Sequence, residues 1–526
     1  MKKVMGLLGI LLVFLSCTGG FREINTDQAG VTEEDLRADY NEYGIRIGVI
    51  QQGIYFNYDY GKGKNWPFQL IQNLNADMFC GYMHDAKPLN GGSHNSDYNL
   101  QDGWNSSMWG HMYGYIFPQI YQSENETRDH MPAFFGITKI LKVEVMHRVT
   151  DYYGPVIYSR FADSEGKYMP DTQKDVYSSF FNELDTAVTV LSDYIRLHKD
   201  ASEFSRFDIL LDGKYSSWIK FANSLRLRLA MRIAVVSPEK SRSECLKALT
   251  NEYGVLEEPN DVVAVSTKGG YTNPLGELNL VWNETYMSAS MESILNGYKD
   301  QRREIYFAVC QSEAYKGEYR GIRQGTCFAH NYYNSLSKLK VNQQTDAVIM
   351  TAAEIWFLRA EAALRGWTNE YVEDCYDQGV KVSFRQHGIL QSEDYLNSDN
   401  IPVDFVDTYD SGNNIKACCK VSPKWAETDD KETKLEKIIT QKWIAMFPEG
   451  CEAWTEQRRT GYPRLFPVRF NHSKDGCIDT EVMIRRLTFP GGLKTENGEQ
   501  YAALVEALGG QDNAGTRLWW DTGTNW

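Results

Sequence analysis

Apolar residues recur at helical spacing in several long segments of this 526-residue chain. Between Ala133 and Arg148, for example, Ile137, Ile140, Leu141 and Val145 follow one another at steps of three and four residues. Such a stripe along one side of a helix must be buried against another element. The pattern recurs in residues 172–191, 215–234, 238–253, 350–367 and 371–387. The chain is therefore predicted to be mainly α-helical.

The helical segments come in consecutive pairs. Thr172 is a suitable N-cap for the second segment, and Gly366 can close the helix that starts near Met350. In that helix alanines alternate with Trp356 and Phe357 on one stripe, so a neighbouring helix can approach closely while the rings fill the grooves. This packing is typical of tetratricopeptide (TPR) helix pairs. An ordinary helical hairpin in an unrelated all-α domain remains the alternative.

Three long stretches between the pairs show no clear period: residues 53–103, 254–285 and 396–430. Loops of this length inside a compact protein are usually functional or disordered. The first two are rich in aromatic residues, which favours a functional role for them.

The N-terminus has the form of an export signal. Lys2 and Lys3 precede an apolar run from Val4 to Leu15, which is too short to span a bilayer. The run ends at Ser16-Cys17, and a cysteine in this position is typical of lipoproteins, in which the thiol carries a diacylglycerol. A chance cysteine behind an ordinary export signal is the alternative. We expect residues 1–16 to be a signal peptide, Cys17 to be lipidated, residues 17–36 to be a tether and residues 37–526 to form one domain.

The composition excludes some partners and favours another. A formal net charge of −15 without long Lys/Arg runs argues against nucleic acid. Nine cysteines besides Cys17 lack paired spacing, so a disulfide framework is not expected, although one or two bridges stay open. Aromatic residues make up 13% of the chain, which indicates an aromatic core or exposed rings that stack on sugars. Carbohydrate is therefore the natural ligand class.

Motifs for catalysis, cofactors and metals are missing. The stretch GKGKNW has Trp66 where a dinucleotide fingerprint needs its third glycine, and there is no P-loop, G-x-S-x-G elbow or H-E-x-x-H. DTYDSGNN, from Asp407, resembles part of a calcium loop but has Cys418 at the position of the required glutamate. We expect no enzyme activity, no cofactor and no metal, with a structural calcium left open. Most acidic residues lie on predicted helix faces, where exposure to solvent is the default.

Seven stretches, in order over nearly the whole chain, carry a family resemblance. They are ILKVEVMHRVTDYYGPVIYS (140–159), WIKFANSLRLRLAMRI (218–233), YRGIRQG (319–325), MTAAEIWFLRAEAALRGW (350–367), IITQKWIAMFPEGCEAWTEQRRTGYPRL (438–465), RRLTFPGG (485–492) and TRLWWD (516–521). In these stretches the chain resembles the SusD/RagB family of nutrient-binding outer-membrane lipoproteins, and in particular the SusD-like subgroup with a C-terminal TRLWWD signature.

The resemblance implies a scaffold of TPR-like helix pairs with irregular insertions that carry the ligand site. It also implies a role in polysaccharide utilisation: such proteins bind an oligosaccharide at the cell surface without hydrolysing it and deliver it to a SusC-like TonB-dependent transporter. The compact acidic run that usually follows the lipidated cysteine in such proteins is reduced here to Glu23. We expect an outer-membrane location, facing the cell exterior.

No short motif of the family fixes the sugar contacts, so physical reasoning has to select them. A sugar ring packs its C–H face on an aromatic ring while its hydroxyls bind polar groups. Four aromatic residues lie beside suitable polar residues or loops and are the candidate ligand contacts: Trp66, Tyr82, Trp104 and Trp282. Trp356, Trp443, Trp519 and Trp520 are interpreted as scaffold.

Two other functions stay open. A glycoside hydrolase needs only two well-placed carboxylates, and the chain has many acidic residues. A non-catalytic envelope adaptor would use the helix pairs for protein contacts.

Overall fold

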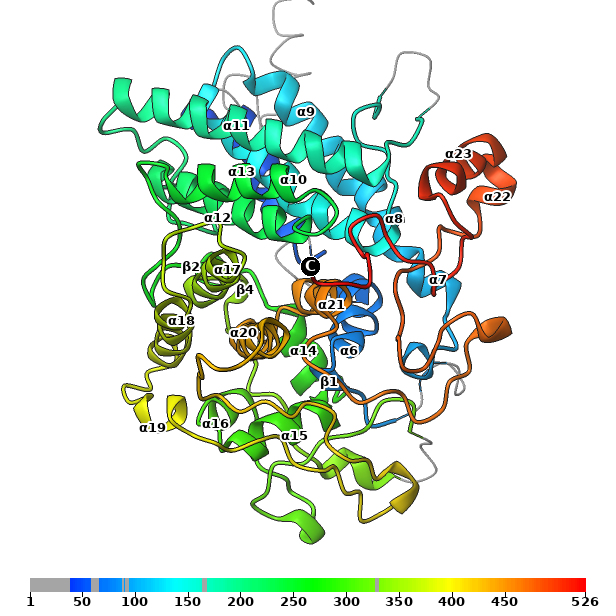
Figure 1. The fold of residues 1–526 in the computed structure, drawn as a ribbon. Coiled ribbons are helices and arrows are strands. Elements are labelled where there is room, and N and C mark those ends of the chain that lie inside the picture. Colours follow the sequence, from blue (N-terminus) through cyan, green and yellow to red (C-terminus); the bar gives the residue numbers. More distant parts are fainter. Residues whose placement is uncertain (1–37, 58–65, 88, 90–93, 163–167, 327–330) are drawn as a thin grey trace, which may run out of the picture.

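The computed structural model describes residues 38–57, 66–87, 89, 94–162, 168–326 and 331–526, and these residues are mostly helical (Figure 1). Cys17, the signal peptide, the tether and most of GKGKNW lie outside the described residues. None of the described helices is both long and apolar enough to cross a bilayer.

The six predicted helical segments are confirmed as α10, α11, α12, α13, α17 and α18, with small shifts of their ends, and the structure adds six further helices of ten residues or more. In the first half of the chain they are α4 (Asn41–Gly53), α9 (Phe117–Thr127), α10 (Pro132–Tyr153), α11 (Gln173–Leu197), α12 (Tyr215–Arg232) and α13 (Pro238–Leu249). In the second half they are α15 (Ala289–Tyr298), α17 (Ala352–Leu364), α18 (Val372–Gln386), α20 (Lys431–Ala445), α21 (Gly450–Thr460) and α23 (Gly498–Leu508).

These helices pack as a continuous series of neighbours. Contacts run from α10 to α11, from α11 to α12, from α12 to α13 and α17, and from α17 to α18 and α20. In Figure 1 the series descends from α11 at the top to α18 at the lower left. The stacked helix pairs confirm the predicted fold class.

Local signals explain where the helices begin and end. The Thr172 hydroxyl accepts a hydrogen bond of 3.2 Å from the Asp175 N–H at the start of α11, as an N-cap should. Gly366, with φ of +71°, follows α17 and donates its N–H to Ala363 O, which ends that helix. α17 and α18 approach so closely that a Cβ added to Gly379 of α18 would lie 2.6 Å from the Phe357 ring of α17.

Two of the stretches predicted to be irregular contain short regular elements instead. Residues 53–103 include α5 (Trp66–Phe68), the π-helix η3 (Gln69–Asn73), α6 (Ala76–Phe79), β1 (Met83–His84), η5 (Asn95–Asp97) and the start of α7 (Asp102–Asn105). After this stretch come α8 (Ser107–His111) and the π-helix η6 (Met112–Ile116). Residues 254–285 include β2 (Val262–Val265) and α14 (Pro274–Leu280). They are too short to produce a sequence period, which is why the periodicity misses them.

The described strands form two small antiparallel sheets. β1 pairs with β3 (Tyr286–Met287), with Met83 opposite Met287. β2 pairs with β4 (Ala347–Thr351), and a register shift falls between Val263 and Ala264. The remaining short α-helices are α16 (Arg303–Tyr306), α19 (Glu393–Leu396) and α22 (Leu493–Glu496).

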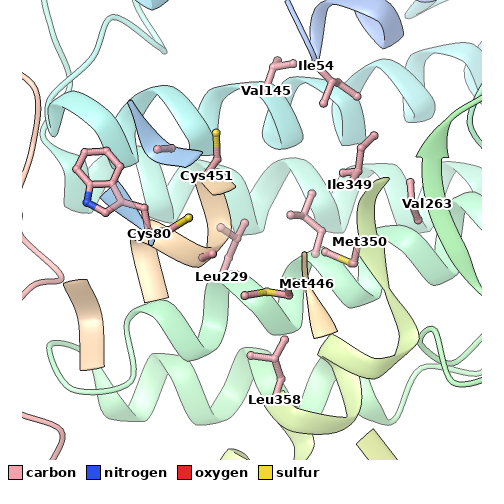
Figure 2. Close-up of a cluster of buried hydrophobic side chains, with 14 of the residues drawn as sticks. Ile54, Cys80, Val145, Leu229, Val263, Ile349, Met350, Leu358, Met446 and Cys451 are labelled. Carbon is pink, nitrogen blue, oxygen red and sulfur yellow. The ribbon is translucent and has the colours of Figure 1, made fainter. Parts of the chain in front are cut away.

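One large apolar cluster joins the helix pairs to the residues between them. Figure 2 shows side chains from segments far apart in the sequence gathered in it, including Ile54, Val145, Leu229, Leu358 and Met446. The cluster also holds Cys80 and Cys451, and the eight cysteines of the described residues are all free.

Buried ion pairs cross between the helices, which the sequence did not predict. Arg228 of α12 makes two hydrogen bonds of 2.7 Å to the Glu354 carboxylate of α17, and both side chains are buried. Arg459 of α21 pairs with Glu361 at 2.6 Å, and Lys442 of α20 lies 3.0 Å from a Glu456 oxygen. The default of solvent exposure is therefore wrong for these acids, since the partner on another helix compensates the charge.

Candidate functional site

Three of the four candidate aromatic residues lie on elements that surround the π-helix η3. Trp66 is the first residue of α5, which runs directly into η3. Trp104 lies on α7, which contacts η3, and Trp282 follows α14, which also contacts η3. A hydrogen bond from the Gln69 amide of η3 to the Glu284 carboxylate ties the Trp282 turn to η3. The fold thus brings together residues more than 200 positions apart.

Trp66 is the most exposed of the four and belongs to a short row of rings. Its side chain is 48% exposed, and its ring meets the His111 ring edge-on at 5.3 Å. His111 stacks in turn on Tyr115, at 5.8 Å, and Tyr115 is 59% exposed. Burial lowers the pKa of His111, so its ring stays neutral at pH 7. The row presents uncharged ring surface to solvent, which suits the C–H face of a sugar.

Tyr115 was missed at the sequence level. His111 and Tyr115 are four residues apart, and residues at this spacing share one side of a helix. That spacing was the available signal. It could not show that the shared side faces solvent.

Trp104 is half-buried and is held by a histidine. The His94 ring meets it edge-on at 6.0 Å. The Ser96 N–H donates a hydrogen bond of 2.9 Å to Nδ1 of His94, and Nε2 of His94 bonds to Asp85 Oδ2. The two bonds fix the His94 ring and, through it, one edge of Trp104.

Asp85 is ionised in this arrangement. Burial acts to raise the pKa of its carboxyl, but the His94 ring that faces it and the hydrogen bonds from His84 and His94 outweigh this and lower the pKa to about 2. His94 and the His84 ring that stacks on it at 6.2 Å are therefore part of the support of Trp104. Among the described residues, no group of three His, Cys, Asp or Glu side chains has the geometry of a metal site.

The asparagine next to Trp104 is used inside the protein. Asn105 is buried, and its side-chain oxygen accepts a hydrogen bond of 3.0 Å from the Asn95 amide. That amide also donates to Asn75, at 2.7 Å. The side-chain oxygen of Asn105 thus has a partner inside the protein.

Trp282 is half-buried and follows Leu280 by two residues. Its backbone N–H donates to Glu277 O, at 3.1 Å, and this turn exposes the neighbouring Leu280 and Val281. Leu280 lines a groove of about 500 Å³ whose walls are mainly apolar. The side-chain oxygen of Asn283 accepts a hydrogen bond from the Tyr286 hydroxyl, at 3.1 Å.

Tyr82 does not offer an exposed ring, and this expectation is wrong. Its side chain is fully buried, its hydroxyl donates to Trp443 O, and its ring lies 5.0 Å from the Trp443 ring and 5.3 Å from Phe447. It directly precedes β1, and the pairing of β1 with β3 holds it against α20. Tyr82 is therefore part of the core.

The other tryptophans have the positions expected of scaffold. Trp443 and Trp520 are buried, and Trp519 is half-buried. The Trp356 ring is half-buried, with the Arg359 guanidinium 3.8 Å above it.

The stretch that resembled a calcium loop is held together by its own hydrogen bonds. Asp407 accepts bonds from the Tyr333 hydroxyl and the Asn413 amide, each at 2.8 Å, and from the backbone N–H groups of Tyr409 and Asp410. Its two oxygens are thus used in folding the turn.

Comparison with known proteins gives a consistent result over the whole chain. Residues 23–521 match the family model described as "SusD-like: Susd and RagB outer membrane lipoprotein". A SusD homologue from Bacteroides vulgatus is 46% identical, with a TM-score of 0.89, and the match covers 93% of this chain and 99% of that one. A chitin-binding SusD homologue from Flavobacterium johnsoniae is 38% identical, with a TM-score of 0.88 and coverage of 92% and 100%.

A SusD homologue from Bacteroides uniformis is 32% identical, with a TM-score of 0.83 and coverage of 91% and 99%. No curated protein sequence matches this chain. The assignment to the subgroup with a TRLWWD signature stays a prediction.

Proposed function

Because this chain belongs to the SusD-like family of outer-membrane lipoproteins, we propose that it is a cell-surface protein that binds an oligosaccharide and delivers it to a SusC-like TonB-dependent transporter. Lipidation at Cys17 would anchor it to the outer membrane, facing the cell exterior. The proposal is non-enzymatic, in line with the family, whose members are known as binding proteins.

The observation that carries the proposal is the grouping of Trp66, Trp104 and Trp282 around η3. Aromatic rings that are exposed together on one part of a surface are typical of ligand-binding sites, whereas single exposed rings are not. Of the ligand classes considered, carbohydrate fits best, since the rings provide flat apolar surface and the protein carries a net charge of −15. The F. johnsoniae homologue that binds chitin supports the choice of first probes.

The test is binding of oligosaccharides to the protein without its lipid anchor. Chitin, cellulose and starch oligosaccharides are titrated into wild-type protein and Trp104→Ala by calorimetry. We expect Trp104→Ala to weaken binding about tenfold, since an aromatic contact of roughly 1.5 kcal/mol corresponds to that factor. Trp356→Ala, on the scaffold side, is the control and should bind like wild type.

The same incubations separate the alternatives. New reducing ends would mean a glycoside hydrolase. No binding to any glycan, together with stable capture of an envelope protein through the helix pairs, would favour the adaptor. Delivery is tested by co-purification with a SusC-like transporter from the native membrane. Absence of the complex would contradict that part of the proposal.

A further inference from the structure

A polar cavity of about 860 Å³ lies beside α7. Its walls come from residues 98–105, 472–478, 488–494 and 511–514, which are far apart in the sequence. Figure 1 shows α7 next to the orange segment that follows α21. The volume lies within the roughly 300–1,000 Å³ typical of small-ligand sites.

The walls are tied together by hydrogen bonds within the protein. The His472 backbone N–H donates to Asp97 O, at 2.7 Å, and its ring lies 2.9 Å from an oxygen of the Asp97 carboxylate. The Gly491 N–H donates to Asp102 Oδ1, at 3.2 Å. Both bonds join the C-terminal wall to the wall that contains α7. The cavity is thus formed before any ligand binds, which lowers the entropic cost of binding.

Several polar groups of the lining have no other use within the described residues. The Asn99 side-chain amide, the Thr488 hydroxyl, the Asp102 Oδ2 atom and the Lys474 ammonium make no hydrogen bond to another described residue. They comprise donors, acceptors and one charge of each sign. These four groups can therefore both donate and accept hydrogen bonds, and their charges cancel.

This combination selects a chemical class of ligand. A hydroxyl group both donates and accepts, so it can pair with a carboxylate as well as with an ammonium group. An anionic ligand would meet the carboxylates of the lining, Asp102, Asp475 and Asp512, and a cationic ligand would meet Lys474 and Lys494. A neutral ligand with many hydroxyls is the class that satisfies all of these groups.

Trp104 lies on the same helical turn, α7, as two residues that line the cavity. Asp102 and Asn105 are three residues apart on α7 and both line the cavity, whereas Trp104 lies between them in sequence and points to His94. A helix with its side chains is only about 10 Å across. An oligosaccharide of several units is long enough to contact Trp104 and reach the cavity.

We propose that this cavity binds the end of a neutral oligosaccharide whose inner units contact Trp104, so that the protein prefers longer chains. The proposal rests on the proposed glycan-binding function and adds the subsite and the chain-length preference. The hydrogen-bonding groups of the cavity would bind the terminal unit, and the aromatic rings would bind the units before it.

The test compares chain lengths in wild-type protein and in a variant with the cavity filled. Asn99→Trp places a large side chain at the cavity wall, where the exposed amide makes no hydrogen bond to another described residue, so the fold is retained. Calorimetry with chitobiose to chitohexaose, and with the matching cellulose and starch series, measures both proteins. Asn260→Trp, an exposed asparagine outside this cavity, is the matched control.

We expect wild-type affinity to rise with chain length. For Asn99→Trp, the gain in affinity from the shortest to the longest chain should be about tenfold smaller, which is the equivalent of one or two hydrogen bonds. The affinity of Asn99→Trp for the disaccharides should stay within about twofold of the wild-type value. Thr488→Val should lose part of the gain in affinity with chain length. If wild type and Asn99→Trp gain equally with chain length, the cavity proposal is overturned and the glycan-binding function stands. If wild type binds no member of any series, the proposed function itself fails.

Discussion

The indole Nε1–H of Trp520 donates a hydrogen bond of 2.9 Å to Asp151 Oδ1, on a helix 369 residues earlier in the chain. The same carboxylate accepts bonds from the Tyr177 hydroxyl, at 2.7 Å, and from Arg232, at 2.5 Å. The TRLWWD stretch therefore packs into the first helix pairs, next to the buried charges. Trp520 is therefore part of the scaffold rather than of the ligand site.

Replacing Trp520 by Phe should test that contact. The smaller ring still fills most of the space, but the donor to a buried carboxylate is lost. We expect the free energy of unfolding to fall by about 1.5–3 kcal/mol, the usual contribution of a hydrogen bond to a charged group. Urea unfolding followed by circular dichroism measures it. Trp526→Phe, at a ring that is 44% exposed, should change stability by less than about 0.5 kcal/mol, and equal losses in the two variants would contradict the assignment.

Glu354→Gln should reveal the strength of the buried ion pairs. The substitution leaves the Arg228 guanidinium buried without its main partner, and loss of one member of such a pair costs about 3–5 kcal/mol. Arg228 also lies 3.7 Å from Glu452 and 3.8 Å from Glu144, so the lower end of that range is expected.

The matched control is Glu313→Gln, in an exposed pair with Lys316 at 3.5 Å. Such surface pairs contribute about 0–1 kcal/mol. Chemical unfolding of both variants gives the comparison. A loss below about 1 kcal/mol for Glu354→Gln would refute a stabilising role for the buried pair.

Gly379→Ala should separate the α17–α18 helix pair. The new Cβ would lie 2.6 Å from the buried Phe357 ring, and overpacking of this kind costs about 1–3 kcal/mol. Gly48 lies in α4 with open space where its Cβ would be, so Gly48→Ala should raise stability by about 0.5–1 kcal/mol. Thermal unfolding shows whether the two substitutions act in opposite directions, and a stabilising Gly379→Ala would exclude the close approach.

The pH dependence of stability should report on Asp77. Burial raises the pKa of its carboxyl to about 7, and the nearby Glu449 carboxylate adds to the effect. The unfolded carboxyl has a pKa of about 3.9, so between these values the folded protein holds a proton that the unfolded chain has lost. This contribution to stability is complete below about pH 4 and is lost as the pH rises through 7.

Asp77→Asn should remove this dependence. Relative to the variant, the wild-type free energy of unfolding should fall by up to about 1.4 kcal/mol per unit between pH 5 and 7. Urea titrations at several pH values measure the difference, and subtraction of the two curves cancels groups that both proteins share. Parallel curves would show that Asp77 does not titrate in this range.

The sequence-level predictions succeeded where a local rule applies and failed where exposure had to be known. Thr172 and Gly366 cap helices because their roles depend on neighbours within a few residues. Tyr82 passed the same local test as Trp104, and Asn105 is the polar neighbour of Trp104 in the sequence. Tyr82 is buried against α20, and the side-chain oxygen of Asn105 is bound to Asn95.

The amino-acid sequence alone determined the helix pairs and the family, since apolar period, caps and family stretches are properties of contiguous residues. Only the tertiary structure decided which rings reach solvent, which acids pair inside the protein and where a cavity opens beside α7. Each of these depends on contacts between different elements, such as Arg228 of α12 with Glu354 of α17, 126 residues later, and no local pattern encodes such contacts.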